Sequence, residues 1–181
     1  LYNNFESRDV LIERGKLWGW DFKRPHQLFI IGAPSSGREV CYDAVGLRLV
    51  VQNTLKASCP GALISEQQNQ LVIIAPLGDS TGLVAKQKAV NLAKTLEKCL
   101  FDKFPDTRFL IGIGKAYAAA DDLYRCYQEA KTALEMGQFL PETSSVIHFE
   151  DLGIIRLLAV INYEQLQDFY KEYLGPLEEY D

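Results

Sequence analysis

Two apolar segments that flank a short polar tip constrain the fold of this chain more than any other feature. They lie in the stretch ALISEQQNQLVIIAP, residues 62–76, and the tip between them is Gln67, Gln68, Asn69 and Gln70. Apolar runs separated by a few polar residues are typical of two antiparallel strands joined by a tight reversal. Residues 62–76 therefore predict a β-hairpin.

The segments around this hairpin alternate between strand and helix patterns. Short apolar runs predict three further strands, at residues 26–34, 108–116 and 146–152. Apolar residues spaced by three and four predict three helices, at residues 38–58, 83–104 and 120–137. The glycines of RFLIGIGKA suggest that another element closely approaches the backbone of that strand.

The order of these elements is β-α-β-β-α-β, followed by one more helix and strand. This order predicts an α+β, ferredoxin-like fold, a mostly antiparallel sheet with helices on one face. Loose helical stripes also precede and follow it. We therefore divide the chain into a helical lead-in (1–24), an α/β domain (25–152) and C-terminal helices (153–181).

Charge and composition exclude several kinds of function. The net charge of −5 argues against direct binding to a nucleic-acid backbone. No apolar run approaches the ~20 residues of a membrane span. The first residues lack the features of a signal peptide, and they also lack Met, so we expect a piece of a longer, cytoplasmic protein.

Cysteine and histidine usage predicts no metal site. The four cysteines form no CxxC pair, and they are Cys41, Cys59, Cys99 and Cys126. Free cysteine packs as a small apolar residue, so we interpret these as reduced, buried thiols. His26 and His148 have no partner at a metal-binding spacing and are interpreted as structural.

The stretch LFIIGAPSSGREVC, residues 28–41, is one substitution short of the phosphate-binding pattern GxxxxGK. In a working loop, a lysine contacts the phosphates and the following hydroxyl binds Mg²⁺. Arg38 and Glu39 occupy those places here, so nucleotide hydrolysis is not expected. Weak anion or ligand binding stays open at four residues, which are Ser35, Ser36, Gly37 and Arg38.

Several linked motifs resemble the GGDEF-like domain of the PucR/CdaR (sugar diacid regulator) family of bacterial transcription factors. They are WGWDFKRPHQLFII, GIG, YQEAKTALEMG, VIHFEDLGIIRLL and YLGPLEEYD. The resemblance implies a fold related to the nucleotide-cyclase palm. It also implies a variable sensor segment upstream and a helix-turn-helix DNA-binding domain after the end of this chain.

Active diguanylate cyclases of related fold carry their signature at the tip of the central hairpin and an acidic metal ligand on the first strand. The matching hairpin residues here are Glu66, Gln67, Gln68, Asn69 and Gln70, and the matching strand is FIIGAPSS. Two Mg²⁺ ions that bridge a triphosphate need carboxylate ligands, which amides cannot replace. The resemblance therefore implies a degenerate cyclase hairpin, no enzymatic activity and no cofactor.

We expect a regulatory domain that connects the sensor and DNA-binding ends of a regulator and self-associates. The alternative is a domain that binds a small-molecule effector, a nucleotide or metabolite, near the hairpin. Apolar stripes near both ends either pack on their own domain or meet a second copy. For a homodimer, the candidate contact residues are Phe169, Tyr170 and Tyr173.

Overall fold

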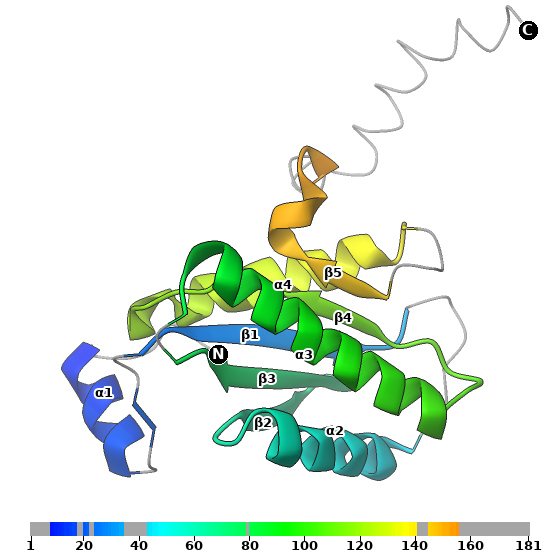
Figure 1. Cartoon of the computed structure of the whole chain (residues 1–181), viewed down its shortest axis with the longest axis horizontal. Helices are drawn as coiled ribbons and strands as arrows, with labels where there is room; N and C mark the ends of the chain where they lie inside the picture. The colour runs from blue at the N-terminus through cyan, green and yellow to red at the C-terminus, as the bar shows by residue number, and fades with distance from the viewer. Residues whose placement is uncertain are drawn as a thin grey trace, which may run out of the picture.

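A single open β-sheet organises the part of the chain that the structure describes (Figure 1). The computed structural model describes residues 8–17, 20–21, 24–34, 43–78, 80–140 and 145–155. The strands are β1 (His26–Gly32), β2 (Leu63–Gln67), β3 (Gln70–Pro76), β4 (Leu110–Ile113) and β5 (Val146–His148). The helices are α1 (Arg8–Leu17), α2 (Ala44–Ser58), α3 (Gly82–Lys103) and α4 (Leu123–Gly137), with short 3-10 turns η1 (Ala120–Asp122) and η2 (Phe149–Leu152).

The strand order β2-β3-β1-β4-β5 confirms the predicted fold class. β1 lies at the centre and pairs antiparallel with β3 on one side and with β4 on the other. β2 pairs antiparallel with β3, as the predicted hairpin requires. β5 is added beside β4 in the parallel direction, because α4 carries the chain back across the sheet between these two strands.

Both faces of the sheet are covered by helices, which corrects the expectation that helices occupy one face. Phe29 and Ile31 of β1 face a core built with α2 and α3. Leu28 and Ile30, which alternate with them, face a second core built with α4. A strand whose residues are apolar without interruption needs cover on both faces, and the run LFII of β1 has that pattern.

α4 lies so close to the β4 segment that Gly112 and Gly114 have no room for a Cβ atom. A Cβ atom added at Gly112 would overlap the backbone oxygen of Ala130, and one added at Gly114 would overlap that of Cys126. These contacts confirm that the glycines of β4 and its following loop allow close approach of another element. The backbone of α4 therefore packs directly on the backbone of the β4 segment.

Several predicted boundaries change. The last predicted strand, residues 146–152, is β-structure only to His148 and continues as η2. The strand ends there because the side chain of His148 accepts a hydrogen bond from the backbone N–H of Glu150, which starts a turn.

The contact residues proposed for self-association, Phe169, Tyr170 and Tyr173, lie outside the described residues.

Candidate functional site

The tip of the β2–β3 hairpin brings the five residues of the degenerate cyclase signature together. Gln67 and Gln70 are paired across the strands, and the two residues between them form the turn. Gln68 and Asn69 have φ values of 48° and 61°, the left-handed conformation that a two-residue hairpin turn of type I′ requires at both positions. Glu66 is exposed at the end of β2.

The side chains of the tip lie against neighbouring elements. The Tyr127 hydroxyl group of α4 donates a hydrogen bond to Gln67 Oε1 at 3.5 Å. The Gln70 side chain lies next to Gly32 at the end of β1, where an added Cβ would come within 3.3 Å of Gln70 Cγ. The hairpin tip, the end of β1 and α4 thus form one junction.

The chain that leaves this junction after β1 contains the candidate anion loop. Ser35, Ser36, Gly37 and Arg38 fall outside the described residues, so weak anion or ligand binding at this loop stays a prediction. Within the described ranges, no group of three or more His, Cys, Asp or Glu side chains is arranged to hold a metal ion. The chemistry available at the described part of the tip is that of amides and one carboxylate.

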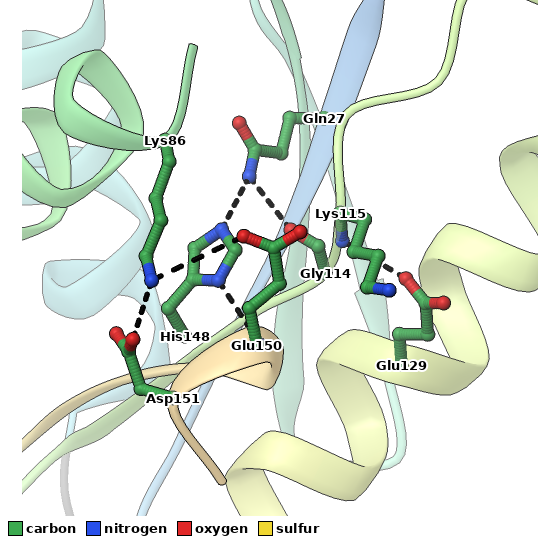
Figure 2. Close-up of polar contacts among 8 residues, drawn as sticks. All are labelled: Gln27, Lys86, Gly114, Lys115, Glu129, His148, Glu150 and Asp151. Carbon is green, nitrogen blue, oxygen red and sulfur yellow. Dashed lines mark hydrogen bonds and ion pairs between the residues drawn. The ribbon is translucent and has the colours of Figure 1, made fainter. Parts of the chain in front are cut away.

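A buried polar cluster lies at the opposite end of β1 (Figure 2). The amide nitrogen of Gln27 donates to the backbone oxygen of Gly114 at 2.6 Å and lies 3.1 Å from His148 Nε2. The other ring nitrogen, His148 Nδ1, accepts the backbone N–H of Glu150 at 3.2 Å. These contacts join the start of β1 to the ends of β4 and β5.

An ion-pair group borders this cluster on the side of α3. Lys86 Nζ contacts Asp151 Oδ1 and lies 4.0 Å from Glu150 Oε2, so the first turns of α3 hold η2 in place (Figure 2). The cluster itself is nearly closed to solvent, with His148 3% exposed and Gln27 fully buried. This arrangement fastens the last described segment of the chain to the sheet.

His148 and Gln27 are a pairing that the sequence analysis missed. The two residues are 121 positions apart, and the sequence alone predicts no partner for His148. One signal was available, since Gln27 is a polar residue at the start of a strand that is otherwise buried and apolar. A buried amide in such a strand needs a polar partner from another element.

Acid is expected to weaken the fold through this cluster. Burial lowers the pKa of His148 below its ordinary value of 6.5, although the nearby carboxylates of Glu150, Asp151 and Glu129 partly oppose burial and Lys86 reinforces it. A neutral imidazole has one acceptor nitrogen and a protonated one has none, so the Glu150 N–H that this ring accepts also disfavours its charged form. The unfolded chain therefore binds more protons than the folded one as the pH falls below 6.5.

We therefore expect the contribution of His148 to the free energy of unfolding to be fully present above this pH, to decrease as the pH falls below it, and to level off below the folded pKa. Urea denaturation across this range measures the effect. His26, whose pKa burial also lowers, contributes in the same direction. The substitution His148→Gln should flatten the pH dependence and His148→Gln/His26→Gln should flatten it further. An unchanged pH dependence in both variants would contradict this assignment.

The fold and the hairpin define an α+β domain with a ferredoxin-like sheet and an altered tip at its central hairpin. The sequence model of the GGDEF-like domain matches residues 3–136. The chain belongs to this family of GGDEF-like domains, which confirms that part of the predicted resemblance.

One curated relative extends the comparison to gene regulation. The chain is 30% identical over 122 residues to the DNA-binding transcriptional activator AdeR of Bacillus subtilis (strain 168). The aligned part covers 66% of this chain and 28% of AdeR, so the chain corresponds to about a quarter of that relative. Among the described helices, none has the length and apolar character to span a membrane.

Proposed function

We propose that this domain is a non-catalytic regulatory module of a bacterial transcriptional regulator of the PucR/CdaR type. In this role it couples an upstream sensor segment to a C-terminal DNA-binding domain of the whole protein. The family assignment and the similarity to a DNA-binding transcriptional activator support the regulatory part. The net charge of −5 supports DNA contact through another domain rather than through this one.

The hairpin tip is the observation that carries the non-catalytic part. Catalysis on a nucleoside triphosphate needs metal-bound carboxylates that neutralise the phosphate charge. Of the five tip residues, four are amides, and the Gln67 amide is already in contact with Tyr127. Glu66 is a single carboxylate exposed to water, and one such ligand holds Mg²⁺ weakly.

A comparison of the whole regulator with this chain tests the proposal. In a gel-shift assay at low salt, the whole protein should bind its own promoter DNA, and the chain of residues 1–181 should not. In a second arm, the chain is incubated with GTP and Mg²⁺ and should form no cyclic dinucleotide. Magnesium-dependent product that is lost in Glu66→Gln would replace the regulatory proposal with an enzyme. Tight binding of duplex DNA by the chain alone would also overturn it.

A further inference from the structure

The outer edge of β2 is free within the described part of the chain. β2 is the first strand of the order β2-β3-β1-β4-β5, and it pairs there with β3 alone (Figure 1). A free edge exposes a row of backbone N–H and C=O groups that can pair with another strand. Natural sheets usually cover or protect such an edge. The residues around the edge of β2 therefore indicate which partner covers it.

The register of the hairpin determines which backbone groups point outward. Gln67 and Gln70 close a two-residue turn, and a pair in that position exchanges both of its hydrogen bonds. Because hydrogen-bonded and non-hydrogen-bonded positions alternate, Ser65 and Leu63 also bond to β3. The backbone groups of Ile64 and Glu66 therefore point to the free edge.

The side chains of these two residues lie on the face of the sheet that α2 covers. Ile64 packs against the core formed with α2 and α3, and Glu66, two residues further along β2, projects from the same face. A cavity of about 350 Å³ opens there between α2 and β2, and its lining includes Arg48, Gln52, Lys56 and Ile64. Arg48, Gln52 and Lys56 follow one another at intervals of four on α2 and therefore share one side of this helix.

The charges around the cavity are unbalanced. Arg48 and Lys56 are exposed, and neither forms an ion pair with any described residue. Glu66 is also exposed and unpaired among the described residues. The edge thus carries two cations beside a cavity and one carboxylate further along the same strand.

We propose that the free edge of β2 pairs antiparallel with β2 of a second copy of this chain, with Ser65 on the two-fold axis. In this register, Ile64 of one copy lies opposite Glu66 of the other. The outward backbone groups of both residues then exchange hydrogen bonds, twice across the axis. The carboxylate of Glu66 from the second copy is placed next to Ile64, at the cavity that Arg48 and Lys56 line.

Self-complementarity singles out a second copy as the partner. A two-fold contact must match one surface to itself, and here each copy supplies both the carboxylate, on β2, and the cations that receive it, on α2 beside the cavity. The contact is short, because β2 has five residues, so we expect a weak dimer that forms with increasing concentration. This surface goes beyond the proposed regulatory role, and the candidate set Phe169, Tyr170 and Tyr173 contains none of its residues.

Sedimentation velocity over a concentration series tests the pairing with the chain as it stands. Glu66→Lys places a cation against Arg48 and Lys56 and should weaken the dimer at least roughly tenfold. Glu66→Pro removes an outward N–H that β3 does not use, and it should weaken the dimer while leaving the hairpin intact. The matched control is Asp102→Lys, which makes the same charge change at an exposed position of α3 and should have no effect.

A charge exchange and a cross-link test the register itself. Adding Arg48→Glu and Lys56→Glu to Glu66→Lys restores opposite charges across the axis and should restore the dimer. Ser65→Cys should form a reducible covalent dimer under mild oxidation, because paired residues without mutual hydrogen bonds lie at a distance that a disulfide can bridge. The unsubstituted chain, with its four native cysteines, is the control for this reaction.

Several results would overturn the proposal. The chain could remain monomeric at every concentration, or the dimer could be unaffected by both Glu66 variants. Dimers that are lost in Phe169→Ser/Tyr173→Ser and retained in the Glu66 variants would assign self-association to the C-terminal residues instead. None of these results affects the test of DNA binding by the whole regulator, so the two proposals can fail separately.

Discussion

Replacing Gly112 with alanine is expected to lower the free energy of unfolding by about 3 kcal/mol, because overpacking a site that cannot move costs this much. The added methyl group would overlap the carbonyl oxygen of Ala130 and would come within 2.6 Å of the backbone nitrogen of Leu134. Both atoms belong to the backbone of α4, which cannot rotate away as a side chain can. Relief requires α4 to move off the sheet, which opens the core on that face.

Urea denaturation of Gly112→Ala measures this cost, and Gly32→Ala is the matched control. Gly32 also lies in a strand of the same sheet, but an added Cβ would meet the side chains of Gln70 and Leu134 at 3.3 and 3.4 Å. These side chains can adjust, so we expect a change of less than about 1 kcal/mol. Equal losses in the two variants would show that strand glycines matter for a reason other than the approach of α4.

The sequence predicts the parts of this fold that depend on local patterns. The hairpin follows from apolar segments around a polar tip, and the close approach of another element to β4 and its following loop follows from Gly112 and Gly114. The face on which a helix packs is different, because it depends on the three-dimensional path of the connection. The amphipathic pattern of α4 shows that the helix is half buried, but it does not distinguish the two faces of the sheet.

The candidate sites also differ in whether local sequence is enough to predict them. The hairpin residues are adjacent in the sequence, so a family resemblance is enough to find them. The cluster of Gln27 and His148 joins residues from opposite ends of the domain, and no spacing rule relates them. Glu129 had a local signal that was missed, because this acidic residue lies among the apolar positions Cys126, Ala130 and Ala133 of α4. A charged residue on the buried side of a helix requires partners in the folded state.

The partners of Glu129 make its removal the second large effect that we expect. Its carboxylate accepts the Lys115 backbone N–H at 3.0 Å and the Tyr117 hydroxyl at 2.6 Å, and its side chain is 8% exposed. Arg125 Nε lies 3.6 Å from the same carboxylate. Glu129→Ala should lower the free energy of unfolding by about 3 kcal/mol, since it leaves both donors without an acceptor at a site that is partly buried from water.

Graded substitutions separate the lost hydrogen bonds from the lost charge. Glu129→Gln keeps one acceptor oxygen for two donors and should cost about half as much as Glu129→Ala. Glu135→Ala, on the same helix, removes an exposed carboxylate that lies 3.9 Å from Lys131 Nζ, and it should cost less than about 1 kcal/mol. In the Tyr117→Phe background, Glu129→Ala should lower the free energy of unfolding by less than in the unsubstituted chain, because one of the two donors to this carboxylate is already absent.

The titration of Tyr117 gives a readout that a general loss of packing would not produce. Burial raises the pKa of Tyr117 above its ordinary value, and the hydrogen bond to Glu129 and the charge of this carboxylate raise it further. In Glu129→Gln the charge is gone while the residue size is kept, so alkaline titration of tyrosinate absorbance should show one tyrosine ionising at lower pH than before. A titration curve identical to that of the unsubstituted chain would mean that the contact between Glu129 and Tyr117 does not persist in solution. In that case another contact must hold the loop after β4 to α4. The Cys126 thiol of α4, which donates a hydrogen bond to the backbone oxygen of Lys115 at 2.9 Å, is such a contact.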